Sequence, residues 1–137
     1  MAKLLGKFPK PKELENLVPD FELCKRIPAG AFADSVLVYW GVKRLDATFE
    51  VVPRAELGPT CHMFIAKGVR VLFPAPTLAE IMDELVLISS EPHCYWIGGW
   101  YALADMPYGD VEEYDMTSPV TAALKLWLEV NNQKWKG

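Results

Sequence analysis

The sequence predicts an α+β fold, in which a mostly antiparallel β-sheet is packed by two to three amphipathic helices. Two segments, near residues 78–88 and 119–130, repeat apolar residues with the period of a helix. The segments before and between them are rich in β-branched and aromatic residues, as strands are. With 137 residues, about half of them hydrophobic, the chain is long enough to bury one core without disulfides.

The chain is expected to divide into an N-terminal tether, residues 1–19, and a single globular α+β domain, residues 20–137. The segment Lys7–Lys12 is basic and rich in proline, so we expect it to be extended and unable to join a helix. Two interpretations are open for this tether. It would either touch an acidic partner as a basic arm or remain a solvated chain end, as termini often do.

In the first half of the globular domain, the sequence predicts a short helix followed by two strands. Asp20 is a suitable N-cap for a helix over residues 21–27. Residues 35–40 and 48–52 are β-branched and aromatic, and they predict a hairpin that Pro53 ends.

The middle of the chain predicts a tight hairpin and then a capped helix. Residues 61–73 hold two apolar runs on either side of Lys67 and Gly68, a pattern typical of a hairpin. Thr77 is the expected N-cap of the next helix, and Glu80 is its capping-box partner. This helix has one apolar stripe, formed by Leu78, Ile81, Met82 and Leu85.

The last third of the chain predicts strands and a closing helix. Residues 93–104 are the most aromatic segment, and they predict one central strand kinked at Gly98-Gly99. Residues 105–115 are expected to form an acidic connector that holds one edge strand. Pro119 suits the first position of the last helix, which Asn131-Asn132 are expected to end.

Charge and cysteine content narrow the class of protein. The formal net charge is −4 and the basic residues are spread along the chain, which argues against nucleic acid as the main partner but leaves a local basic patch open. The three cysteines form no CxxC pair, as expected for free thiols in a reducing cytosol. The N-terminus lacks the apolar core of a signal peptide, and no apolar run approaches the roughly 20 residues that span a bilayer. We therefore expect a cytoplasmic protein without a membrane partner.

Two Cys/His dipeptides are the strongest candidates for metal chemistry. Cys61-His62 and His93-Cys94 together supply the ligand set of a structural zinc site. Their spacing argues against such a site, because neighbouring residues in a strand point to opposite faces. Buried thiols with surface or capping histidines are the alternative, and a Cys–His nucleophile pair is a remote one. We expect no catalytic residue, no bound metal and no cofactor.

The aromatic segment supplies the candidate binding residues. In an extended chain Trp96 and Trp100 share one face with Cys94, while Tyr95 and Tyr101 take the other. An exposed tryptophan face would stack bases or a sugar, or form a protein interface. In the alternative interpretation the tryptophans fill the core beneath the helices. The candidate binding residues are therefore Trp96, Trp100 and, in the basic tail, Trp135.

Two stretches of the chain carry a family resemblance. Phe73–Leu85, read as FPAPTLAEIMDEL, and Ser118–Leu128, read as SPVTAALKLWL, resemble the helices of small uncharacterised proteins in phage and mobile-element regions of gut Bacteroidales genomes. Glu22–Arg26, ahead of the aromatic strand Val38–Trp40, is similar to the usual start of that group. Ser118 stands where the group has Asn. The resemblance implies a phage or mobile-element accessory protein, and it implies no activity, substrate or site.

These observations support three functional hypotheses. The leading one is a non-enzymatic protein-interaction domain, because the nucleotide-binding, hydrolase and zinc-protease motifs are absent from the sequence. The alternative is a binder of a small ligand or of single-stranded nucleic acid that uses the aromatic strand. A metal- or cysteine-dependent enzyme is the third. The sequence leaves the oligomeric state and the identity of any partner open.

Overall fold

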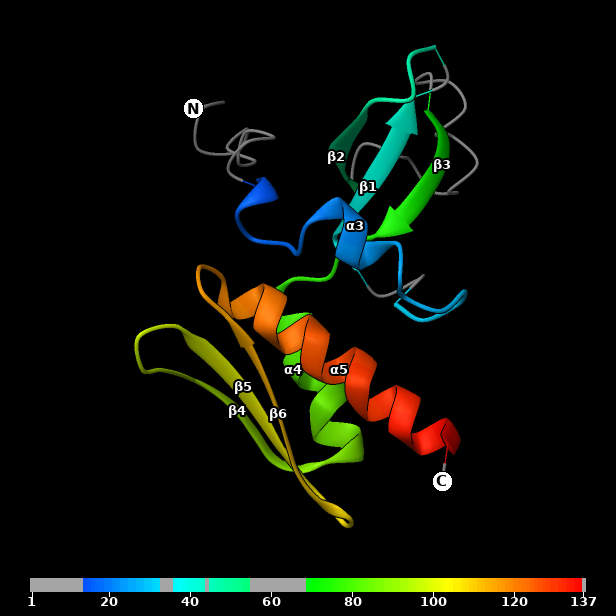
Figure 1. Ribbon diagram of the computed structural model, residues 1–137. Coiled ribbons are helices and arrows are strands. Elements are labelled where there is room, and N and C mark those ends of the chain that lie inside the picture. Colours follow the sequence, from blue (N-terminus) through cyan, green and yellow to red (C-terminus); the bar gives the residue numbers. More distant parts are fainter. Residues whose placement is uncertain (1–13, 33–35, 44, 55–68, 137) are drawn as a thin grey trace, which may run out of the picture.

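A computed structural model of the protein describes residues 14–32, 36–43, 45–54 and 69–136. The described strands form two separate sheets (Figure 1). Sheet A has the order β2-β1-β3 and consists of β1 Val38–Lys43, β2 Phe49–Pro53 and β3 Val69–Pro74. Sheet B has the order β4-β5-β6 and consists of β4 Ser90–Trp96, β5 Trp100–Met106 and β6 Gly109–Asp115. The named helices are α3 Phe21–Cys24, α4 Leu78–Ile88 and α5 Pro119–Lys136.

The predicted α+β class is confirmed, because the described strands pair antiparallel and helices pack against the sheets. The strands nevertheless form two sheets, whereas the sequence analysis expected one. The chain leaves β3 through Pro74-Ala75-Pro76, where the amide of Ala75 donates to the carbonyl of Val38 at 3.0 Å. Proline has no N–H for a sheet ladder, so pairing stops there and α4 separates the two sheets.

The capping box predicted at the start of α4 is confirmed. The Thr77 amide donates to Glu80 Oε1 at 2.8 Å, and the Glu80 amide donates to Thr77 Oγ1 at 3.4 Å. The second carboxylate oxygen of Glu80 accepts from the amide of Leu37, just before β1, at 3.0 Å. Ile81 and Leu85 of the predicted stripe are fully buried. Glu80 therefore both caps α4 and ties this helix to sheet A.

Helix α5 covers one side of sheet B and links the two halves of the molecule (Figure 1). Ala122 and Ala123 on α5 are fully buried, as are Ala102 and Ala104 on β5, so small side chains allow helix and sheet to approach closely. Trp127 of α5 contacts Phe32, which precedes β1 of sheet A in the chain, and their ring centroids are 4.9 Å apart. The buried residues of both halves belong to one hydrophobic cluster.

The prediction of a single kinked strand over residues 93–104 is wrong. This segment is a hairpin, in which β4 and β5 pair antiparallel around a turn at Gly98-Gly99. Gly98 has a φ of 63°, and the amide of Ile97 donates to the carbonyl of Gly99 at 3.0 Å. A positive φ costs glycine little, so the two glycines reverse the chain where a kink was expected.

Other boundaries also differ from the prediction. Helix α5 continues past Asn131 to Lys136, and Asn131 Nδ2 donates to the carbonyl of Trp127 within the helix at 2.8 Å instead of ending it. Leu14, Val18 and Pro19 are buried, so the described end of the expected tether is packed against the core. Within the hairpin expected over 61–73, residues 61–68 lie outside the described residues, and β3 pairs with β1. The described helices include none that is long and apolar enough to cross a membrane.

Candidate functional site

The two faces of sheet B differ in what covers them. The inner face, which carries Ala102 and Ala104, packs against the helices and the core. The outer face carries Tyr95, Tyr101 and Tyr114, because side chains alternate along each strand. No described helix lies on this outer side of the sheet (Figure 1).

The register arranges the outer side chains in rows that cross the strands. We call this surface the tyrosine face. Its rows are Tyr95–Tyr101–Tyr114, His93–Leu103–Glu112 and Asp105–Asp110. The rings of Tyr95 and Tyr101 are stacked, with centroids 5.2 Å apart and planes at 10°, and the Tyr101 and Tyr114 centroids are 4.9 Å apart. Rigid aromatic side chains therefore cover one end of the face and carboxylates lie at the other.

Gly99, at the hairpin turn, makes room for the outermost ring of the tyrosine row. A Cβ atom at this position would lie 2.2 Å from a ring carbon of Tyr114, far closer than carbon atoms approach in proteins. The Tyr114 ring therefore rests on the glycine backbone, and Gly99 is buried beneath it.

Tyr95 and Glu112 are joined across β5. The Tyr95 hydroxyl donates to Glu112 Oε2. This hydrogen bond, with slight burial and the nearby negative charge, raises the pKa of Tyr95 to about 12. The phenol thus engages one carboxylate oxygen of Glu112, and no described donor contacts the other oxygen.

The tyrosine face lies within a segment that has no basic side chain. Residues 71–124 contain nine Asp and Glu and no Lys or Arg, so their formal charge is −9, and the rest of the chain carries +5 to give the total of −4. Asp105 and Asp110 stand directly opposite each other in the β5–β6 ladder. Among the described residues, the ion pairs are Lys25–Glu22, Lys43–Glu50 and Lys125–Asp115, and none neutralises the face.

Two of the tryptophans predicted as binding residues, Trp96 and Trp100, lie on the inner side of the β4–β5 hairpin. Trp100 is half-buried and packs against the core, as the alternative interpretation expected. Trp96, at the end of the hairpin, is 57% exposed and contacts Trp100 with ring centroids 5.5 Å apart. The Trp135 side chain lies outside the described residues. A binding role for these three residues stays a prediction.

Sequence reasoning placed Tyr95 and Tyr101 on a shared face but missed Tyr114. The missing information was the pairing of β6 with β5, which places Tyr114 directly opposite Tyr101. Reading Ile97-Gly98-Gly99 as a three-residue turn would have predicted the β4–β5 hairpin with Tyr95 opposite Tyr101. A second turn at Pro107-Tyr108 would have added β6 and completed the tyrosine row.

The residues considered for metal or nucleophile chemistry are not brought together in the described part of the chain. Cys61 and His62 lie outside it. His93 is exposed on the outer face with Nδ1 3.0 Å from the carbonyl of Glu91, whereas Cys94 is directed to the core and burial raises its pKa. Burial, with the charge of Asp20, also raises the pKa of Cys24 to about 12, so both described thiols are poor nucleophiles. The described residues include no group of three or more Cys, His, Asp or Glu placed to hold a metal ion.

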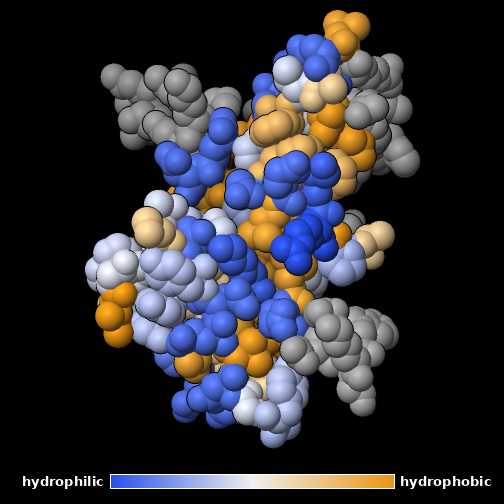
Figure 2. Space-filling model, in the orientation of Figure 1, coloured by the Kyte–Doolittle hydropathy of each residue, from blue (hydrophilic) through white to orange (hydrophobic). Residues whose placement is uncertain are grey.

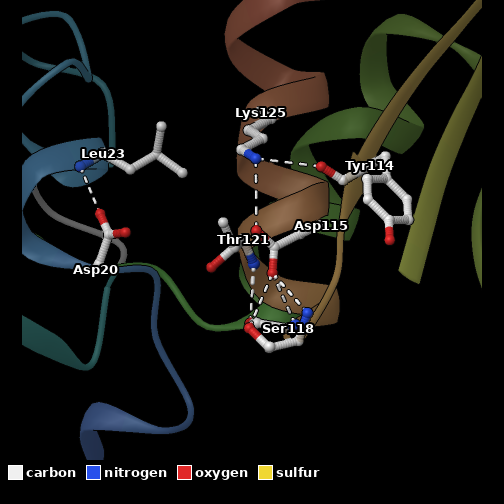
Figure 3. A network of polar contacts seen from close by, with 8 residues as sticks. Asp20, Leu23, Tyr114, Asp115, Ser118, Thr121 and Lys125 are labelled. Carbon is white, nitrogen blue, oxygen red and sulfur yellow. Dashed lines mark hydrogen bonds and ion pairs between the residues drawn. The ribbon is translucent and has the colours of Figure 1, made fainter. Parts of the chain in front are cut away.

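A groove of about 820 Å³ lies between α3 and the start of α5, and two of its carboxylates accept hydrogen bonds from amides at the starts of these helices. Asp20 accepts from the amide of Leu23 at 2.8 Å and caps α3. Asp115 accepts from the amides of Thr117 and Ser118 at 3.1 and 2.9 Å (Figure 3). Burial alone would raise the pKa of Asp115, but these hydrogen bonds and the nearby Lys125 hold it below its ordinary value.

Asp20 and Asp115 of the groove are therefore engaged within the protein, whereas the carboxylates of the tyrosine face have no basic partner among the described residues. In Figure 2, side chains of intermediate hydropathy gather over the β4–β5 hairpin, and hydrophobic ones gather mainly over sheet A. We take the tyrosine face as the candidate site. Searches against models of protein families, curated proteins and solved structures found no match to this chain.

Proposed function

We propose that this chain is a non-enzymatic protein-interaction domain that binds a partner protein through the tyrosine face of sheet B. The observation that carries the proposal is the row of stacked rings, Tyr95, Tyr101 and Tyr114, on a sheet face with no described helix over it. An open face of an antiparallel sheet is usually polar, so a row of aromatic rings on such a face indicates a surface that binds a partner. Tyrosine is enriched in interfaces because its rigid ring supplies contact area at a small entropic cost.

The charge of the surface favours protein over nucleic acid as the partner. A surface that binds nucleic acid neutralises phosphates with Lys or Arg, and residues 71–124 contain neither. Stacked aromatics alone would suit single-stranded bases, but Asp105, Asp110 and Glu112 would repel the backbone of the strand. The resemblance to mobile-element-associated proteins adds a biological setting, an accessory protein that acts by binding.

Affinity capture with matched variants tests this proposal. The tagged protein would be captured from nuclease-treated lysate of its native host as the wild type, as Tyr95→Ser/Tyr114→Ser, and as Val86→Ser/Leu87→Ser. The last variant is the control, because Val86 and Leu87 are 61% and 75% exposed on α4, on the other side of sheet B. Circular dichroism would verify that each variant is folded.

We expect a stoichiometric partner that survives nuclease, is lost from the tyrosine variant and is kept by the α4 variant. Retention of the same partner by the tyrosine variant would contradict the proposal. Partners that disappear with nuclease would support the nucleic-acid alternative instead.

A further inference from the structure

We propose that the segment bound by the tyrosine face is rich in arginine, with guanidinium groups that stack on the tyrosine row and pair with Asp105, Asp110 and Glu112. This inference rests on the proposed function and adds the chemistry of the partner. It joins two separate properties of one surface, its aromatic row and its uncompensated negative charge.

The negative charge of the face is not paired with any basic side chain among the described residues. Asp105 and Asp110 are directly opposed cross-strand neighbours, an arrangement that destabilises a sheet when both side chains are ionised. Such a pair gains when a cation binds between its members. The basic side chains of the described ion pairs lie just after α3, in sheet A and on α5, and none is paired with this row.

The aromatic row selects arginine over lysine. A guanidinium is planar and weakly hydrated, so it stacks on a tyrosine ring while its N–H groups still pair with a carboxylate. Adjacent rows of the face are two residues apart along the strands, roughly 7 Å. An extended segment with arginine at every second position repeats at the same interval, so successive guanidinium groups would reach the tyrosine row, Glu112 and the Asp105–Asp110 pair.

Titration with synthetic peptides tests the inference. Fluorescein-labelled (Gly-Arg)6 and (Gly-Lys)6, which have equal charge, would be titrated with the protein at low and moderate salt and followed by fluorescence anisotropy. The protein variants would be Tyr95→Ser/Tyr114→Ser and Asp105→Asn/Asp110→Asn. Asp83→Asn/Glu84→Gln is the matched control, because it removes the same charge from α4, on the other side of the sheet.

We expect the arginine peptide to bind at least about fivefold more tightly than the lysine peptide. The tyrosine variant and the Asp105/Asp110 variant should each weaken binding of the arginine peptide by roughly tenfold. The α4 variant should weaken this binding by less than about twofold. Equal binding of the two peptides, or an equal loss from the face and α4 carboxylate variants, would overturn the inference, since net charge alone would then explain the affinity.

Failure of the inference is distinguishable from failure of the proposed function. If (Gly-Arg)6 does not bind while the captured partner still depends on Tyr95 and Tyr114, the arginine-rich segment is wrong and the tyrosine face remains the interface. If the captured partner is also indifferent to these tyrosines, both proposals are overturned.

Discussion

At the scale of single residues, the tyrosine face depends on a glycine and a carboxylate that hold its rings. Gly99 leaves the space that the Tyr114 ring occupies, and Glu112 accepts the hydroxyl of Tyr95. Neither residue is aromatic, yet each fixes the position of a ring. Their substitution should therefore alter the surface more than it alters the stability of the protein.

The first prediction concerns Gly99→Ala. The new Cβ would meet the ring of Tyr114, a side chain at the surface that is free to rotate away, so we expect the ring to leave Tyr101. The free energy of unfolding, measured with urea, should fall by about 1 kcal/mol or less, since overpacking is relieved outside the core. In Tyr114→Ser protein, Gly99→Ala should lower the free energy of unfolding by less than it does in the wild type. An equal decrease in both proteins would contradict the contact between position 99 and the Tyr114 ring.

The second prediction concerns the pH dependence of Tyr95. Its folded pKa of about 12 lies above its ordinary value of 10, so the hydrogen bond to Glu112 contributes stability below pH 10 and loses it as pH rises through 12. In Glu112→Gln the pKa of Tyr95 should fall toward 10. NMR titration of the labelled tyrosine ring carbon measures this pKa, with Asp83→Asn on α4 as the control. An unchanged pKa in Glu112→Gln would contradict the assigned partner.

At the scale of elements, the β5–β6 ladder combines aromatic stacking with charge repulsion. Tyr101 and Tyr114 form a favourable cross-strand pair, whereas Asp105 and Asp110 form an unfavourable one two rows away. A ladder selected for stability alone would not oppose two carboxylates. Their retention is understandable if the row serves a cationic partner.

The third prediction follows from this pairing. Asp105→Asn should stabilise the free protein by about 0.2–1 kcal/mol, because it removes like-charge repulsion across the ladder. Thermal unfolding at low salt would measure this increase in stability. Added salt should reduce the difference between variant and wild type, because it screens the repulsion between Asp105 and Asp110 in the wild type. A loss of stability at neutral pH would show that Asp105 has a structural role.

The sequence predicted those elements whose signals are local. Helix α4 begins where Thr77 and Glu80 form their capping box, and α5 begins at Pro119, because caps and proline act within one turn. The β4–β5 hairpin was missed because Gly98-Gly99 allows either a kink or a reversal, and tertiary pairing decides between them. The tyrosine face depends on that pairing, so only part of it could be predicted.

At the scale of the whole molecule, the two sheets share one hydrophobic core although their charges are segregated. The buried cluster includes Trp40 of sheet A, Ala102 of sheet B and Leu124 of α5. The contact between Phe32 and Trp127 lies where the two halves meet. Sheet A and sheet B should therefore unfold together rather than as independent units.

The fourth prediction compares two tryptophans. Trp127→Ala should lower the free energy of unfolding by about 3–5 kcal/mol. The Trp127 side chain is buried against Phe32, and α5 cannot move to fill the cavity that its removal leaves. Trp96→Ala, at a side chain that is 57% exposed, should cost about 1 kcal/mol or less. Urea unfolding followed by circular dichroism measures both. Similar costs for the two variants would contradict the shared core.

We propose that the outer face of sheet B is the binding surface, and NMR mapping of the bound peptide can locate that surface. Amide spectra of the labelled full-length protein would be recorded while unlabelled (Gly-Arg)6 is added. We expect the largest shifts on β4, β5 and β6, at Tyr95, Tyr101, Glu112 and Tyr114. Shifts confined to α4, or to the groove beside Phe21 and Phe49, would contradict it.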